Sequence, residues 1–192
     1  MKIYLLDKNK GMTDFWKIYF EQCNNVEIVN EDFQIFMEGN TVECVVSPAN
    51  SFGLMDGGYD FAITEYFGTK LMKEVQSYII KNYNGEQPVG TAFIVNIPNT
   101  NKKLIHTPTM RTPSRIKDPM VVYFAMRETL RIAKNNNIGS IVIPAFGGNC
   151  GGLKYQTIAE MMKLAYDEFD NVPEEISWEY ADRIKELRKY EY

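Results

Sequence analysis

Short apolar runs alternate along the chain with longer stretches in which apolar residues recur at helical spacing. Strands are predicted at Lys2–Leu6, Val26–Val29, Cys44–Val46, Thr91–Ile97, Leu104–His106 and Gly139–Pro144. Helices are predicted at Thr13–Cys23, Tyr59–Phe67 and about Leu71–Ile79, then from Pro119 to about Asn136, from Tyr155 onward, and from Pro173 to the C-terminus. This alternation indicates an α/β fold, a three-layer α/β/α sandwich with a mixed, largely parallel central sheet.

Residues suited to helix ends fix several of these boundaries. Thr13 is the expected cap of the first helix, which turns Phe15, Ile18 and Tyr19 inward. Asp118 is expected to cap the helix that Pro119 begins. We expect residues 1–192 to form a single domain, with the helix from about residue 173 as a C-terminal extension.

The stretch Glu43–Ile63 organises the rest of the chain. Its strand stops at Ser47-Pro48-Ala49-Asn50, because proline cannot donate to a central ladder. A loop with Gly53, Gly57 and Gly58 follows, and then the helix from Tyr59. A glycine loop between a strand and a helix start is the geometry of an anion site, since backbone N–H groups point at the ligand. The spacing fits neither a Walker A loop nor the GxGxxG fingerprint.

A second glycine loop, 147–152, follows the strand Gly139–Pro144 in the same way. In parallel sheets, loops at the carboxyl ends of strands form the ligand cleft. Two anion-binding loops that face one cleft suit a diphosphate. Asp32, just past the second strand, can accept from an exocyclic amine or a ribose hydroxyl, and a solvated turn carboxylate is the alternative interpretation.

Composition narrows the class of protein. The chain has 192 residues, 45% of them apolar, which is ordinary for a globular domain with a sizeable core. A net charge of -4 argues against a nucleic-acid partner. The sequence shows neither a signal peptide nor a membrane span, and Cys23, Cys44 and Cys150 are expected to be free thiols in the reducing cytoplasm.

Three isolated residues invite functional interpretations that the pattern does not favour. His106 is the single histidine and lies in an apolar run, so a core position is favoured over catalysis. Cys150 lacks an evident basic partner, so nucleophilic chemistry is disfavoured. Arg111 suits a phosphate or a surface ion pair. No His or Cys cluster has metal-ligand spacing, and no metal site is expected.

Five motifs in order resemble those of the macro domain, the ADP-ribose-binding family, over nearly the whole chain. They are Asn30-Glu31-Asp32-Phe33, the strand end VVSPAN, the first loop GLMDGGYDFAI, the second loop IPAFGGNCGGL, and HTPTMRTP with the helix containing Tyr123. The last is similar to a bacterial and phage branch often labelled for ADP-ribose 1″-phosphate (Appr-1-p) processing. The resemblance implies the macro-domain fold.

The resemblance also implies residue roles. Asp32 matches the aspartate that accepts from the adenine amino group, with the Phe33 amide beside the ring. Asn50 matches the asparagine on the distal ribose, and Asp60 the aspartate that hydrolytic members use near the anomeric carbon. The first phosphate loop matches Gly57, Gly58 and Tyr59; the second matches Gly147, Gly148, Asn149, Cys150 and Gly151.

Three residues depart from the family pattern. Asp56 stands in place of a small residue before the Gly-Gly pair, and Phe61 in place of a small residue after Asp60. Lys154 stands where a different hydrolytic branch has its catalytic aspartate, so the mechanism of that branch is not expected.

The resemblance therefore implies that the chain binds ADP-ribose and hydrolyses a derivative, either mono-ADP-ribosylated protein or ADP-ribose 1″-phosphate. A non-catalytic reader of ADP-ribosylated protein and a structural or phage-associated macro domain are the alternatives. No cofactor is expected beyond ADP-ribose as ligand or product.

Overall fold

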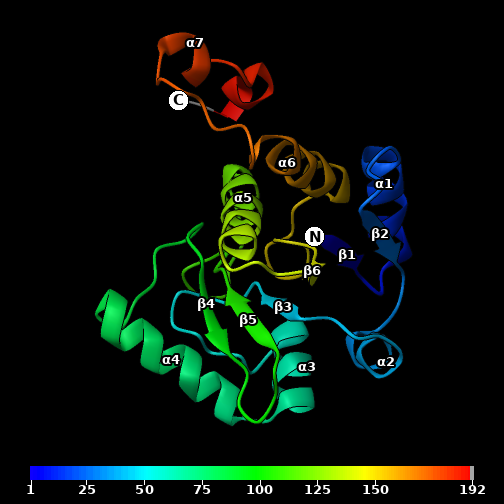
Figure 1. Ribbon diagram of the computed structural model, residues 1–192, viewed down its shortest axis with the longest axis vertical. Helices are drawn as coiled ribbons and strands as arrows, with labels where there is room; N and C mark the ends of the chain where they lie inside the picture. The colour runs from blue at the N-terminus through cyan, green and yellow to red at the C-terminus, as the bar shows by residue number, and fades with distance from the viewer. Residues whose placement is uncertain (191–192) are drawn as a thin grey trace.

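The computed structural model describes residues 1–190, in which six strands form one sheet in the order β2-β1-β6-β3-β5-β4 (Figure 1). The strands are β1 (Lys2–Leu6), β2 (Val26–Val29), β3 (Cys44–Ser47), β4 (Phe93–Asn96), β5 (Lys103–His106) and β6 (Ser140–Pro144). Neighbouring strands are parallel except for the antiparallel pair β4–β5. The predicted mixed, largely parallel sheet is confirmed.

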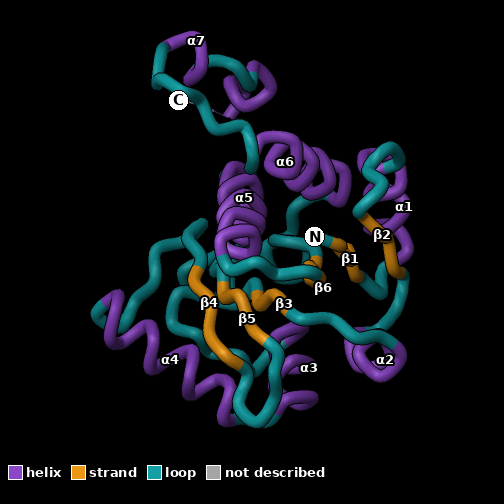
Figure 2. The backbone as a smooth tube through the Cα atoms, in the orientation of Figure 1, coloured by secondary structure: helices purple, strands orange, loops and turns teal. Residues whose placement is uncertain are grey.

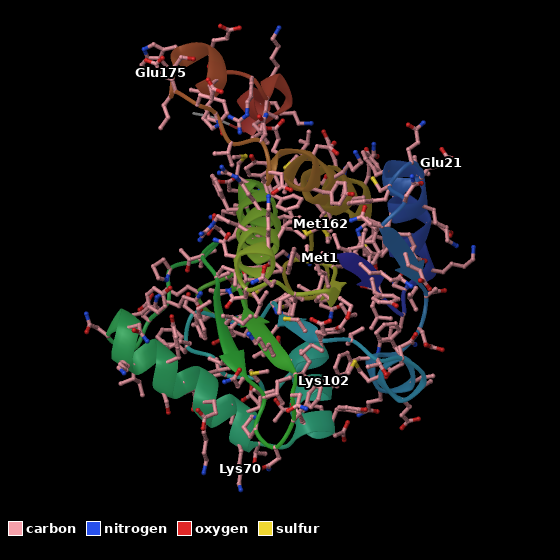
Figure 3. The ribbon with its side chains drawn as sticks, in the orientation of Figure 1. Met1, Glu21, Lys70, Lys102, Met162 and Glu175 are labelled. Atoms are coloured by element: carbon pink, nitrogen blue, oxygen red, sulfur yellow. The ribbon has the colours of Figure 1, made fainter. Side chains whose placement is uncertain are left out.

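Helices cover both faces of this sheet, which gives the predicted three layers (Figure 2). One face carries α1 (Lys10–Phe20), α5 (Met120–Asn135) and α6 (Tyr155–Glu168), and the other carries α2 (Phe33–Gly39), α3 (Gly58–Phe67) and α4 (Lys70–Tyr83). Strand side chains alternate between the faces. In β1, Ile3 and Leu5 pack under α1 and α6, whereas Tyr4 and Leu6 pack on the other side. Figure 3 shows Met162 of α6 inside the first of these layers.

The first helix begins earlier than predicted. Its cap is Asn9, whose side chain accepts from Gly11 N, and Thr13 lies inside the helix with its hydroxyl bonded to Lys10 O. The buried face of the helix is formed by Met12, Trp16 and Phe20, and Ile18 lies off this face and is 69% exposed rather than inward. Asn9 outcompetes Thr13 as a cap because asparagine is the better N-cap residue.

A short helix that the sequence pattern did not predict follows β2. Asp32 is the N-cap of α2, and its Oδ1 accepts from Gln34 N at 3.0 Å. The helix has seven residues, too few for a clear helical periodicity. Capping is compatible with ligand binding, because the cap occupies one carboxylate oxygen of Asp32.

The predicted long helix from Pro173 is wrong. Its described part, residues 173–190, forms only α7 (Trp178–Ala181) and a 3₁₀ helix, η1 (Lys185–Tyr190), which project beyond α5 and α6 (Figure 1), and the last two residues of the prediction lie outside the described residues. Ile176 and Trp178 are 84% and 87% exposed, and a helix gains most of its stability from burying one face. The segment is anchored by Leu187, which packs on the core, and by an ion pair between Arg183 Nε and Glu168 Oε2 at 2.6 Å.

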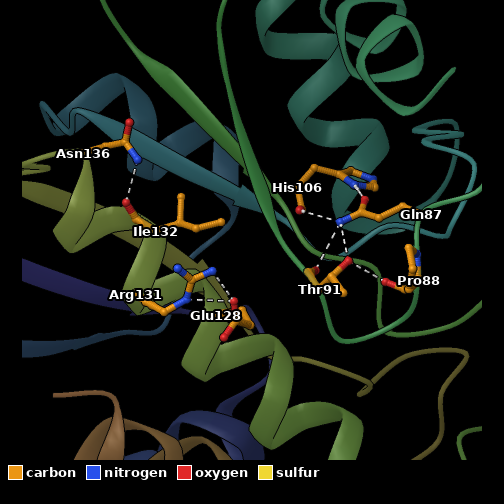
Figure 4. Close-up of polar contacts among 8 residues, drawn as sticks. All are labelled: Gln87, Pro88, Thr91, His106, Glu128, Arg131, Ile132 and Asn136. Atoms are coloured by element: carbon orange, nitrogen blue, oxygen red, sulfur yellow. Dashed lines mark hydrogen bonds and ion pairs between the residues drawn. The ribbon is translucent and has the colours of Figure 1, made fainter. Parts of the chain in front are cut away.

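The remaining predicted elements are found with shifted ends. Helix α5 begins at Met120 with Pro119 as its N-cap, one residue later than predicted, and Asp118 Oδ1 accepts from Met120 N at 2.9 Å beside this helix start. β4 starts two residues later than predicted, because Thr91 instead bonds with Gln87 and Pro88 in a turn (Figure 4). Within residues 1–190, no helix combines the length and apolar character that crossing a membrane requires.

Candidate ligand cleft

A two-lobed cleft opens where β1, β3 and β6 end at the same edge of the sheet. The first lobe, about 320 Å³, lies beyond the ends of β1 and β2. The second, about 310 Å³, lies beyond β3 and between the two glycine loops. Both are lined by Gly58, Tyr59, Ala145, Gly148 and Asn149, so the lobes form one continuous cleft across this junction.

The first lobe is lined by both carboxylates and aromatic side chains. Asp32 lines it with one carboxylate oxygen engaged in the α2 cap, which leaves the other for a ligand donor. Asp7 follows β1, and its Oδ1 accepts from Asn9 N at 2.7 Å. Burial raises the pKa of Asp7, although this hydrogen bond opposes the shift. The ring of Phe33 is buried and meets Tyr59 edge-on at 5.2 Å between centroids.

The backbone geometry of the junction is suited to an anion. Helix α3 begins at the junction with Gly57 as its cap, and no side chain bonds its first N–H groups. Such free N–H groups and the helix dipole favour a negative charge. Gly58 has φ of +56°, which other residues adopt only with strain. In the second loop, a Cβ on Gly151 would lie 2.5 Å from Gly147 O, so only glycine allows this close chain crossing.

The second lobe contains a carboxyl group bonded to a strand end. Asp60 lies in the first turn of α3, and its Oδ1 accepts from Ser47 Oγ at 2.6 Å. Ser47 is fully buried at the end of β3. Its side chain points to the same face of the sheet as that of Val45, two residues earlier, and this face is the one that the α3 layer covers. Burial raises the pKa of Asp60 to about 7, with the Ser47 hydrogen bond opposing the shift. Asp60 is thus poised to exchange a proton near neutral pH.

Asn50 anchors the first loop as well as lining the second lobe. Its Oδ1 accepts from Phe52 N and Leu54 N at 3.1 and 3.3 Å, and its Nδ2 donates to Leu54 O at 2.9 Å. An amide oxygen has two lone pairs, so the acceptor is saturated and one N–H remains for a ligand. In this conformation Asn50 can donate to a ribose hydroxyl but cannot also accept from it.

The cleft is acidic although its loops suit an anion. Within residues 1–190, its charged lining consists of carboxylates and a single ammonium group: Asp7, Glu31 and Asp32 with Lys8 in the first lobe, and Asp56 and Asp60 in the second. The hydroxyl of Tyr59 is buried without a hydrogen-bond partner among residues 1–190. Burial, with smaller effects of Asp60, Asp7 and Asp32, raises the pKa of Tyr59 well above its usual value.

All the predicted site residues line this cleft. The first lobe has Asp32 and Phe33; the second has Asn50, Gly57, Asp60, Gly147, Cys150 and Gly151; the junction has Gly58, Tyr59, Gly148 and Asn149. Their individual roles stay predictions. The sequence interpretation missed Asp7, which directly follows a predicted strand, and Ser47, which ends another. The rule that parallel strands end at one edge was the signal for both.

The residues that depart from the family pattern divide between the cleft and the surface. Asp56 lines the second lobe and is exposed, whereas Phe61 and Lys154 line neither lobe. Arg111 also lies outside both lobes and forms a bidentate ion pair with Glu86, with Nε–Oε1 at 2.7 Å. Of the two interpretations of Arg111, the surface ion pair is the one the structure shows.

His106 is buried, as predicted, away from the cleft. Its Nδ1 lies 2.6 Å from Gln87 Oε1, and Gln87 Nε2 donates to Thr91 and to His106 O (Figure 4). This arrangement requires the proton on Nδ1 and leaves Nε2 buried without a partner in the described part of the chain. Burial lowers the pKa of His106 to about 3, so the ring is neutral.

Two further features concern the cysteines and the possible metal ligands. Cys23, Cys44 and Cys150 are all unpaired, as predicted. Across residues 1–190, no three His, Cys, Asp or Glu side chains gather closely enough to ligate a metal ion.

Comparison with known proteins identifies the family. The profile of the Macro domain family matches residues 46–162. The chain belongs to the macro domain family. The matched residues include the whole second lobe and exclude Asp7, Asp32 and Phe33 of the first. The first lobe of this macro domain therefore includes residues that the family profile does not cover.

Relatives and solved structures agree with this assignment. A protein of Aeropyrum pernix is 33% identical over 64% of this chain and 62% of its own length. The O-acetyl-ADP-ribose deacetylase of Escherichia fergusonii is 29% identical over 67% of this chain and 72% of its own. Structures of the Oceanobacillus iheyensis macrodomain, one with ADP and one of a variant with ADPR, superpose with a TM-score of 0.60 at 21% identity. They cover 78% of this chain and 86% and 88% of theirs, and they establish the macro-domain fold.

Proposed function

We propose that this macro domain binds ADP-ribose, with adenosine in the first lobe, the diphosphate across the junction and the distal ribose in the second lobe. The free oxygen of Asp32 suits the adenine amino group, and the remaining N–H of Asn50 suits a ribose hydroxyl. The α3 N–H groups and the glycine loop 147–151 suit the diphosphate. ADP and ADPR, which are bound in the Oceanobacillus iheyensis structures, and the activity named for the Escherichia fergusonii relative support the same class of ligand.

We further propose that the protein hydrolyses an ADP-ribose derivative at the distal ribose, with Asp60 as general base. The observation that carries this proposal is a half-buried carboxyl in the second lobe with a pKa of about 7, held by Ser47. A base with a pKa near the working pH is efficient, because its basic form is both populated and strong. Asp60 takes a proton from the attacking water, and Ser47 orients the carboxyl.

The charges of the second lobe favour some derivatives over others. Asp56 and Asp60 line it, and no Lys or Arg of residues 1–190 does. A dianionic 1″-phosphate would sit beside two carboxylates without a cation, which is unfavourable. An uncharged linkage avoids this repulsion. We therefore place mono-ADP-ribosylated protein and O-acyl-ADP-ribose ahead of ADP-ribose 1″-phosphate as substrates.

Calorimetry tests the binding proposal. ADP-ribose is expected to bind with micromolar affinity, about -8 kcal/mol. Asp32→Asn is the sharpest variant, because asparagine caps α2 equally well but presents an NH₂ donor where the ligand needs an acceptor. It is expected to weaken binding by about 1–3 kcal/mol. Absence of heat with ADP-ribose at millimolar concentration would reject the proposal.

A substrate panel tests the hydrolysis proposal. Mono-ADP-ribosylated protein, O-acetyl-ADP-ribose and ADP-ribose 1″-phosphate are incubated with the wild type, with Asp60→Asn and with Glu65→Gln, a matched change on the exposed side of α3. Asp60→Asn is expected to slow turnover by about 100-fold or more with nearly unchanged ADP-ribose affinity. Wild-type turnover in Asp60→Asn would refute the role of Asp60. Binding without turnover of any substrate would identify a reader.

A further inference from the structure

The outer wall of the second lobe is apolar. It is formed by Leu54, Met110, Pro113 and Cys150, from the first loop, the segment after β5 and the second glycine loop. Leu54 is 46% exposed although it faces a pocket. Apolar side chains grouped around a concave site are what an apolar ligand group covers.

This wall is fixed to the residue proposed to hold the distal ribose. Both backbone groups of Leu54 bond with the Asn50 amide, at 2.9 and 3.3 Å. Met110 pairs with Asn50 in a backbone bridge, and Ser51 N donates to Met110 O at 3.2 Å. Cys150 Sγ lies 3.5 Å from Met110 Sδ. The apolar wall and the ribose donor therefore keep a fixed relation to each other.

We propose that this wall binds the hydrocarbon part of an acyl chain longer than acetyl, carried as an ester on a hydroxyl of the distal ribose. The inference rests on the proposed binding of ADP-ribose and adds the class of substituent. A phosphate or a hydrated peptide would leave the apolar surface of Leu54 and Met110 unmatched, whereas an acyl chain buries it.

Hydrolysis of such an ester balances with water alone. Water adds to the acyl carbonyl carbon, and the bond between that carbon and the ribose oxygen breaks. Asp60 accepts the proton of the water and delivers it to the leaving ribose oxygen. The products are a carboxylic acid and ADP-ribose, and no oxidant or cofactor takes part.

The test is a chain-length series. ADP-ribose bearing acetyl, propionyl, butyryl and hexanoyl groups on the distal ribose is prepared as esters for turnover and as non-hydrolysable amides for binding. The full chain is expected to bind the amides about two- to threefold more tightly for each added CH₂, less than for complete burial because the wall is half-exposed. The esters are expected to show the same trend in kcat/KM.

Variants locate the effect. Leu54→Ala removes an exposed side chain that packs on no core residue cluster, and it is expected to reduce the butyryl-to-acetyl affinity ratio to about twofold or less. Met110→Ala provides a second change in the wall. Ile80→Ala, a 66% exposed position on α4 outside both lobes, is the control and should keep the ratio.

Each outcome separates this inference from the proposed function. Normal binding of ADP-ribose with a flat or falling chain-length series would overturn the acyl site and leave the proposed function standing. A rise that persists in both Leu54→Ala and Met110→Ala would also overturn it, because the chain would then bind elsewhere. Failure to bind ADP-ribose itself would remove both.

Discussion

The hydrogen bond from Ser47 to Asp60 allows the effect of Ser47→Ala on the pKa of Asp60 to be predicted. It stabilises the charged form of a carboxyl group whose pKa is raised to about 7 by burial. A hydrogen bond to a charged group contributes about 1.5–3 kcal/mol, and one pKa unit corresponds to about 1.4 kcal/mol. Ser47→Ala should therefore raise the pKa of Asp60 further, by about one to two units.

The consequence for turnover depends on pH. If Asp60 acts as a base, the rate rises with pH and levels off above its pKa. In Ser47→Ala the inflection should move from about pH 7 to about pH 8–9, so the rate falls by about 5- to 50-fold at pH 7 and largely recovers at pH 9.5. Ser47→Thr keeps the hydroxyl and is the matched control. The assay is a pH profile of kcat on the best substrate of the panel.

A direct titration of Asp60 distinguishes a change in its pKa from an indirect effect of misfolding on the rate. The carboxyl carbon of Asp60, followed by ¹³C NMR, should titrate at higher pH in Ser47→Ala than in the wild type. A rate that drops equally at all pH values, with an unchanged titration midpoint, would refute the proposed coupling. Ser47 would then be only a structural residue at the end of β3.

Four further predictions concern Asp60, His106, the salt dependence of ligand binding and Asn50. Asp60→Asn should stabilise the fold by about 1–3 kcal/mol at pH 8 and little at pH 4 in urea unfolding, because a raised carboxyl pKa lowers stability as pH rises from about 4 to 7. His106 should destabilise the fold as pH falls from about 6.5 toward 3, with a slope approaching 1.4 kcal/mol per pH unit that His106→Gln removes, also in urea unfolding. ADP-ribose affinity measured by calorimetry should not weaken between about 50 and 500 mM salt, because screening relieves repulsion in an acidic cleft; a tenfold loss would contradict this. Asn50→Ala should reduce both binding and turnover by several-fold, since it releases the loop backbone at Phe52 and Leu54; wild-type values in both assays would contradict this.

The strands and glycine loops could be predicted because their signals are local. The run Cys44–Val46 is buried on both faces, as expected of a central parallel strand, and Pro48 ends it. Two glycine loops after parallel strands must meet at one edge, and the observed junction of Gly58 with Gly148 and Asn149 follows from that rule. These features depend on neighbours in sequence and on sheet direction alone.

Features that depend on which face of a strand or helix a residue occupies, or on packing between segments distant in sequence, could not be predicted in this way. The contact of Ser47 with Asp60 requires knowing which face of β3 each residue meets and how the intervening loop returns. The start of α1 depended on competition between two good caps, Asn9 and Thr13. The helix from Pro173 was predicted from proline as a helix-start residue, but Trp178 is 87% exposed, and a start signal does not show whether a buried face exists to stabilise the helix.

Among residues 1–190, no Lys or Arg lines the second lobe, and this lack of cations connects the proposed chemistry to the proposed substrate. A lysine or arginine there would help to hold a phosphate, but it would also lower the pKa of Asp60 and weaken it as a base at neutral pH. The lobe has instead Asp56, an apolar wall at Leu54 and Met110, and backbone amides at the junction. Amides hold a diphosphate through directed hydrogen bonds and add no mobile charge next to the base. The same composition therefore keeps Asp60 basic near pH 7 and favours an uncharged substituent on the distal ribose.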